Sequence, residues 1–206
     1  MKDEMDILRE VSSIAAGHGS IALSEMIGRK LNLSLPSLTI VPAQELLGRL
    51  PVDQIVISVT CNILSGLKGE IIFVLSEKSA FQLIDSCLRN HTGDNPTSFF
   101  TEMGLSAIKE VGNIIISSYV GALSMILKTI VIPSIPTLMS GSLDQVLSMV
   151  ISSYKKDNLI LMVEAEFIDP KESISGSFYL VLTHDSMKSI QDACKKILAS
   201  VHEGTS

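Results

Sequence analysis

The sequence predicts an α+β protein made of two similar halves, each running helix, three strands, helix. Long helical stretches at 4–31 and 101–128 are each followed by β-branched runs, and residue types recur at an offset of one hundred residues. We expect a single domain over 1–206 with pseudo-repeats 1–92 and 99–200. The halves should share one six-stranded sheet about a pseudo-twofold axis, with the two long helices side by side.

The helix predicted at 101–128 has two contrasting faces. At about 100° per residue, its apolar side chains gather on one broad face that should enter a core. That face consists of Ile108, Val111, Gly112, Ile115, Tyr119, Ala122 and Ile126. On the opposite side Ser106, Glu110, Asn113 and Ser117 fall within about 60° of one another. A carboxylate and an amide therefore lie one turn apart among small hydroxyl side chains, free to contact another molecule.

The same polar pattern occurs one hundred residues earlier. The first copy consists of Asp6, Glu10, Ser13 and Pro36, and the second of Ser106, Glu110, Asn113 and Pro136. An offset that holds from the helix to the proline indicates an internal duplication. Near the end of each half the offset grows to 107 residues, as between Cys87 and Cys194. The copies differ where the first has a serine and the second has an asparagine.

The other elements follow from local composition. β-Branched runs separated by glycine and proline predict strands, and a serine followed by acidic residues predicts the start of a helix. The predicted strands are 38–43, 54–63, 69–76, 145–154, 158–167 and 176–183, and the further helices are 76–90 and 185–198. Residues 91–98 have a turn composition and should link the halves.

Charge and hydropathy narrow the possible partners and the compartment. The net charge is −6 and no run of lysine and arginine occurs, which argues against a nucleic-acid partner. The N-terminal ten residues alternate charged and apolar types, unlike a signal peptide, so we expect a cytoplasmic protein. The uncharged stretch 111–127 approaches the length of a membrane span, but its asparagine, serines and glycines favour a buried helix and no membrane span.

Cysteine and histidine usage predicts neither disulfides nor an intrinsic metal site. The three cysteines are an odd number in apolar surroundings, as expected of cytosolic thiols. The four histidines are scattered and have no metal-ligand spacing. We interpret His18 as a surface residue.

The paired motif resembles that of the CheC family of chemotaxis phosphatases, part of the CheC, CheX and FliY superfamily. The motif is Asp or Ser, then Glu, then Asn, with Pro after a further twenty-two residues, and its spacing occurs twice. The resemblance covers almost the whole chain and implies the same pseudo-twofold fold. It also implies that the protein dephosphorylates the phosphoaspartate of the response regulator CheY.

Carried over by position, the resemblance makes Glu110 and Asn113 the catalytic pair. A side-chain amide suits this role because it can accept a hydrogen bond from water, donate another to a phosphoryl oxygen, and carry no charge that repels the anion. Glu110 would dock against a lysine beside the phosphorylated aspartate. Ser106 and Pro136 would support the site, and Mg²⁺ would be supplied by the regulator, with no intrinsic cofactor.

The first copy is predicted to be a degenerate second centre. Glu10 fits the motif, but the hydroxyl of Ser13 lies closer to the backbone than an amide and cannot reach as far. Water positioning should therefore fail there even if Glu10 still docks. Asp6 and Pro36 are interpreted as supporting residues, at the helix surface and before the first strand.

An alternative function is that of a binding module. Within the CheC family the receptor deamidase CheD is a partner, so the chain could serve as a CheD-binding adaptor or as a phospho-CheY-binding module with little phosphatase activity. A flagellar-switch scaffold without activity is a third possibility. The intact pair Glu110 and Asn113 argues for retained catalysis.

Overall fold

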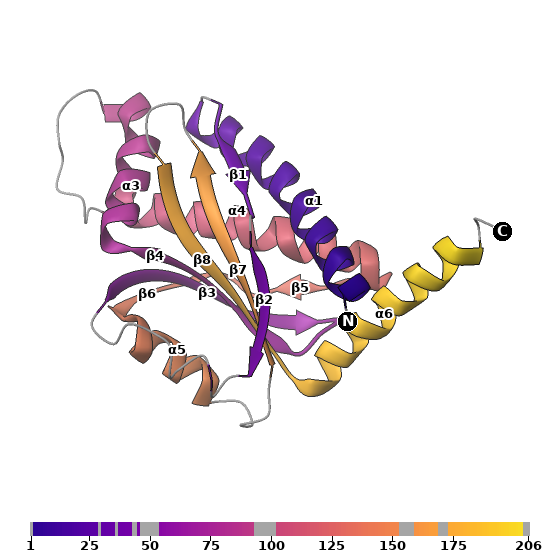
Figure 1. Ribbon diagram of the computed structural model, residues 1–206. Coiled ribbons are helices and arrows are strands. Elements are labelled where there is room, and N and C mark those ends of the chain that lie inside the picture. Colours follow the sequence, from indigo (N-terminus) through magenta and orange to yellow (C-terminus); the bar gives the residue numbers. More distant parts are fainter. Residues whose placement is uncertain are drawn as a thin grey trace.

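One antiparallel sheet of eight strands lies at the centre of the part of the chain that the structure describes (Figure 1). The structure is a computed structural model and describes residues 2–28, 30–35, 37–42, 45, 54–92, 102–152, 159–168 and 173–203. The strands are β1 (Asn32–Ser34), β2 (Leu38–Pro42), β3 (Ile55–Ser65), β4 (Gly69–Ser76), β5 (Ile132–Pro133), β6 (Thr137–Ser142), β7 (Leu159–Ile168) and β8 (Ser173–Leu182). The helices are α1 (Lys2–Ile27), α3 (Glu77–Thr92), α4 (Glu102–Leu127), α5 (Leu143–Ser152) and α6 (His184–Glu203).

Strand pairing interleaves the two halves of the sequence. The order is β1-β7-β8-β4-β3-β5, with β2 also paired to β7 and β6 also paired to β3. The short strands of the first half thus pair with the β7–β8 hairpin, and those of the second half pair with the β3–β4 hairpin. β4 and β8 join the hairpins in the middle, from Gly69 opposite Leu182 to Leu75 opposite Gly176. The predicted α+β class with a shared sheet is confirmed.

Helices cover both faces of the sheet. α1 and α4 pack against each other on one face, and α5 packs on the other (Figure 1). Because successive strand residues point to opposite faces, Val59 and Cys61 of β3 face the long helices while Val56 faces α5. The main core therefore lies between the sheet and α1, α3, α4 and α6, and a smaller core lies beneath α5.

The predicted helix at 101–128 is confirmed as a buried helix of the core. α4 is long and apolar enough, by length and composition, to cross a membrane. Its large apolar side chains instead enter the protein interior: Ile108, Val111, Ile115 and Tyr119 are each at most 2% exposed. The other three predicted helices and five of the six predicted strands also occur, with ends shifted by a few residues.

The strand predicted at 145–154 is wrong, because residues 143–152 form helix α5. Its apolar residues Val146, Leu147, Val150 and Ile151 are buried at helical spacing. A reciprocal cap starts the helix: Gln145 N–H donates to Ser142 Oγ (3.3 Å), and Ser142 N–H donates to Gln145 Oε1 (3.4 Å). The sixth strand is β6 instead, and the short strands β1 and β5 were not predicted.

Equivalent contacts occur at positions related by the sequence repeat. Ser24 Oγ near the end of α1 accepts a hydrogen bond from Leu31 N–H (2.9 Å), and Ser124 Oγ near the end of α4 accepts one from Val131 N–H (3.1 Å). Each serine holds the chain that leaves its helix. At the offset of 107, hydroxyl caps recur where α3 and α6 begin: Ser79 N–H donates to Ser76 Oγ, and Ser186 N–H donates to Thr183 Oγ1.

Because β4 and β8 lie in close contact at Gly69, a side chain at this position should lower the stability of the protein. A Cβ there would lie against the carbonyl oxygen of Val181 and 2.8 Å from Leu182 Cδ2. We expect Gly69→Ala to lower the free energy of unfolding by about 1–3 kcal/mol, measured by urea denaturation. Gly17→Ala is the control, because Gly17 is an exposed helical glycine with open space around it and should gain up to about 1 kcal/mol. Equal stability of Gly69→Ala and the parent would contradict this packing.

Candidate functional site

The packing of α4 places the predicted catalytic residues on its outer surface. Because Ile108, Val111 and Ile115 are buried against the sheet, the opposite side of the same turns must face outward. Glu110 is exposed there, and Asn113 is half-buried one turn further along. The two residues predicted from sequence are thus brought together on one helical surface.

Glu110 and Asn113 are free to bind another molecule. Within the described part of the chain, no hydrogen bond or ion pair engages either side chain. Ser106 and Ser117 are exposed on the same side, and their small side chains leave the longer carboxylate and amide projecting. An unpaired carboxylate can accept a hydrogen bond from a cation, and the amide can both donate and accept.

The first copy has a different arrangement on α1. Glu10 and Ser13 are both exposed, on the outer side of that helix. Asp6 forms an ion pair with Arg9, 2.7 Å from Oδ1 to Nη1, and both side chains are more than half exposed. An exposed pair of this kind adds little stability, but it supplies Asp6 with a partner, unlike Ser106 on α4. The offset of the two motifs therefore places comparable side chains on two helices, with an amide on only one.

One of the two motif prolines, Pro36, lies outside the described residues. Pro136 is half-buried in the short connection between β5 and β6. That connection is held to β3, because Ser134 N–H donates to the Asn62 carbonyl (2.7 Å) and Ser134 Oγ accepts from Asn62 N–H (3.0 Å). The position of Pro136 fits a structural role in the connection, outside the α4 surface.

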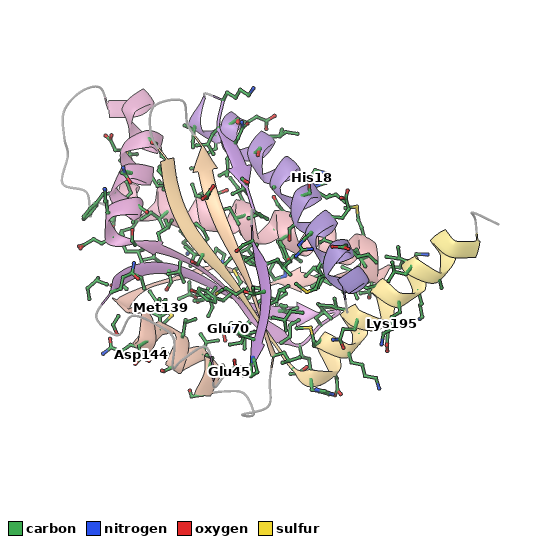
Figure 2. The ribbon with its side chains drawn as sticks, in the orientation of Figure 1. His18, Glu45, Glu70, Met139, Asp144 and Lys195 are labelled. Atoms are coloured by element: carbon green, nitrogen blue, oxygen red, sulfur yellow. The ribbon has the colours of Figure 1, made fainter. Side chains whose placement is uncertain are left out.

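The contact between α1 and α4 buries a tyrosine. Tyr119 is 1% exposed, and its ring packs on Phe178 with centroids 4.8 Å apart. Burial raises the pKa of Tyr119 to about 12, the Ser12 hydroxyl opposes the rise and the neighbouring Cys194 adds to it. His18 is exposed on α1, as predicted. It lies on the other side of the sheet from Asp144 of α5 (Figure 2).

The candidate site lies on the outer surface of helix α4. A cavity of about 620 Å³ between α4, the β3–β4 turn and α6 contains none of the predicted site residues. Its lining includes Leu67, Lys128, Asp192 and Lys196. The described residues also contain no group of three or more His, Cys, Asp or Glu side chains that could hold a metal ion. A site on the outer surface of a helix suits a protein partner better than a small free substrate.

The cysteines lie apart from this surface. Cys61, Cys87 and Cys194 are buried and form no disulfide bond. Burial raises the pKa of Cys61 from its ordinary 9.0 to about 11; the negative charge of Glu70 adds to the rise and Lys109 opposes it. Because a thiolate is the reactive form, such a thiol is poorly suited to nucleophilic catalysis.

Comparison with protein families identifies one match that contains the α4 motif. Residues 103–140 match the CheC-like family, a stretch that includes Ser106, Glu110, Asn113 and Pro136. The first motif lies outside this stretch.

Two proteins of Bacillus subtilis (strain 168) are similar in sequence. The CheY-P phosphatase CheC is 32% identical over 136 residues, which cover 66% of this chain and 65% of that protein. The flagellar motor switch phosphatase FliY is 25% identical over 123 residues, covering 60% of this chain and 32% of that protein. The matches thus span just under two thirds of one relative and about one third of the other.

Solved structures share the fold. The Thermotoga maritima FliY structure superposes with a TM-score of 0.75 at 22% identity, covering 95% of this chain and 98% of that one. The CheX–CheY complex from Borrelia burgdorferi, which contains BeF3 and Mg²⁺, gives a TM-score of 0.52 at 17% identity over 85% of this chain and 97% of that one. At these identities the similarity establishes the architecture.

The burial of Cys61 predicts low thiol reactivity. A rise of two pKa units lowers the thiolate fraction at pH 8 about a hundredfold. We therefore expect the native protein to react with Ellman's reagent at least about a hundred times more slowly than the protein in urea, in which all three thiols should react. The contribution of Cys61 to stability should be complete below pH 9 and lost as the pH rises toward 11. Rapid native-state labelling of Cys61 would contradict its burial.

Proposed function

We propose that this chain belongs to the CheC-like family and dephosphorylates the phosphoaspartate of the response regulator CheY in the cytoplasm. The observation that carries the proposal is the exposed, unpaired Glu110 together with the half-buried, unpaired Asn113, within the described part of the chain and inside the segment that matches the family. The similarity to a CheY-P phosphatase supports the choice of substrate.

Asn113 would position the attacking water. Its amide oxygen accepts a hydrogen bond from water, and its amide nitrogen donates one to a phosphoryl oxygen. The water oxygen attacks phosphorus in line with the leaving aspartate oxygen, the phosphorus–aspartate bond breaks, and the products are a free carboxylate and inorganic phosphate. The protons of the water remain with the phosphate or pass to solvent. The contribution of the enzyme is then mainly geometric.

Glu110 would dock the regulator. Its exposed carboxylate lies one turn from Asn113 and can accept hydrogen bonds from a lysine beside the phosphorylated aspartate. This contact would fix how deeply Asn113 enters the regulator's site. Mg²⁺, which lowers the charge on the phosphoryl oxygens when bound, would be held by the carboxylates of the regulator.

We interpret the α1 copy as a docking surface without efficient catalysis. Ser13 is exposed at the position that corresponds to Asn113, and Glu10 is exposed at that of Glu110. The equivalent serine contacts at the ends of α1 and α4, and the equivalent caps of α3 and α6, support an origin of the halves by duplication. A duplicated protein can lose one centre while keeping the other.

The adaptor function is the second candidate, and Ser13 is the observation that favours it. A centre with a docking carboxylate and no amide could hold phosphorylated CheY without hydrolysing it. Binding of CheD stays a prediction from the family resemblance. Asn113 favours catalysis over a purely adaptor role, because binding alone does not require an amide at that position.

Replacing Asn113 tests the catalytic centre. We expect Asn113→Ala to lower the stimulated decay of phosphorylated CheY about 10²-fold, because it removes the group that orients water. The measurement is the release of phosphate from CheY of the same organism, phosphorylated and then separated from its phosphodonor. Ser117→Ala is the matched control, since Ser117 is exposed on the same side of α4 and should leave the rate unchanged. Absence of stimulation by the parent protein, with binding intact, would favour the adaptor.

Restoring an amide at position 13 tests the degenerate centre. We expect Ser13→Asn to raise the stimulated rate, up to about twofold if the two centres act independently. The stronger measurement combines the changes: Ser13→Asn in an Asn113→Ala background should recover activity that Asn113→Ala alone lacks. A double variant as inactive as Asn113→Ala would contradict the interpretation that the missing amide alone inactivates the first centre.

A further inference from the structure

Gly112 of α4 lies directly against Val59 of β3. A Cβ added to Gly112 would fall 2.7, 2.7 and 2.8 Å from three carbon atoms of the Val59 side chain. Carbon atoms in protein cores pack at about 3.5–4.0 Å. The helix can occupy its place against β3 only because residue 112 has no side chain.

Val59 cannot readily move aside. It is fully buried, and its β-branched side chain is stiff about the first torsion. Its strand is also held on both sides, because Val59 is paired with Phe73 of β4 and with Leu138 of β6. A side chain at position 112 would therefore displace the helix and leave the strand in place.

The displaced turn is the one that carries the candidate site. Residue 112 lies in the backbone between Glu110 and Asn113, directly before the amide. A side chain at position 112 would push this turn of α4 away from the sheet. Asn113 would then move relative to Ser106 and to the carboxylate of Glu110. The rate of such a reaction is sensitive to small displacements of the positioning group, since a misplacement of about 1 Å costs on the order of 10² in rate.

We propose that Gly112 is a positioning residue for the phosphatase centre, an inference that rests on the proposed function. The missing side chain seats α4 on Val59 and thereby sets the position of the Asn113 amide. The other copy differs at the same place, where Ser12 is buried and donates to the Leu8 carbonyl (3.0 Å). The helix with the amide thus has the close approach, and the helix without the amide accommodates a side chain.

Matched variants separate this role from a general effect of glycine. Gly112→Ala should lower the maximal rate of CheY dephosphorylation about tenfold or more, while the concentration for half-maximal rate changes less than about threefold, because Glu110 still docks. Gly121→Ala is the control, since Gly121 lies on the same helix with no atom within 4 Å of an added Cβ, and its rate should equal that of the parent. A folded Gly112→Ala protein with the parental maximal rate would overturn the proposal.

Making room in the sheet should reverse the effect. Val59→Gly removes all three side-chain atoms that a Cβ at 112 would meet, so the double variant Gly112→Ala with Val59→Gly should recover to within about threefold of Val59→Gly alone. Assays at least about 15 °C below each melting temperature keep loss of folded protein out of the comparison. If Gly112→Ala does not fold, the double variant still decides the question, because a folded but slow double variant would overturn the proposal.

A spectroscopic measurement distinguishes failure of this inference from failure of the proposed function. In ¹H–¹⁵N spectra of the free protein, Gly112→Ala should shift the side-chain amide signals of Asn113, and Gly121→Ala should not. This readout needs no regulator. Shifted signals together with no phosphatase activity in the parent protein would contradict the proposed function and support the packing role of Gly112. Unshifted signals would overturn the inference about Gly112 whatever the activity.

Discussion

The pairing of β4 with β8 is the interaction on which the rest of the fold depends. These strands join the two hairpins into one sheet, and each hairpin in turn receives the short strands of the other half of the chain. Gly69 and Gly176 permit this close pairing, since each faces a leucine side chain from the opposite strand. Without the central pair, both hairpins would present unpaired strand edges, and the long helices would have no common surface to cover.

The candidate site follows from that surface. α4 must bury its apolar side against the sheet, so its polar side becomes a rigid, outward-facing row that a partner protein can reach. We propose that Val59 and Gly112, on the buried side of the helix, set the position of this row, and that Glu110 and Asn113, on its outer side, supply the chemistry. α1 packs beside α4 on the same face of the sheet, yet Ser13 supplies only a hydroxyl. Under the proposed function, this difference decides which of the two surfaces can position water at a bound phosphoryl group.

Much of this could be predicted from sequence because helix periodicity is a local signal. The faces of α4 and the outward positions of Glu110, Asn113, Glu10 and Ser13 follow from spacing alone, and the repeat indicates that two such helices exist. The strand prediction at 145–154 was wrong because an apolar, β-branched run suits a strand as well as a buried helix. The Ser142 and Gln145 cap was the missed local signal. The short strands β1 and β5, and the contact of Gly112 with Val59, depend on distant partners that no local pattern contains.

The interleaved sheet has a consequence for synthesis on the ribosome. When residues 55–76 have emerged, β3 and β4 can pair with each other, but β6 and β8, which protect their outer edges, are made only as the chain reaches residues 137–182. The first hairpin must therefore wait, with apolar edges open, for about a hundred residues of further translation, roughly 5–20 s at common elongation rates. Productive folding of this sheet must therefore wait until β6 and β8 have been made, and the nascent first half is the stage most exposed to misassociation with other chains.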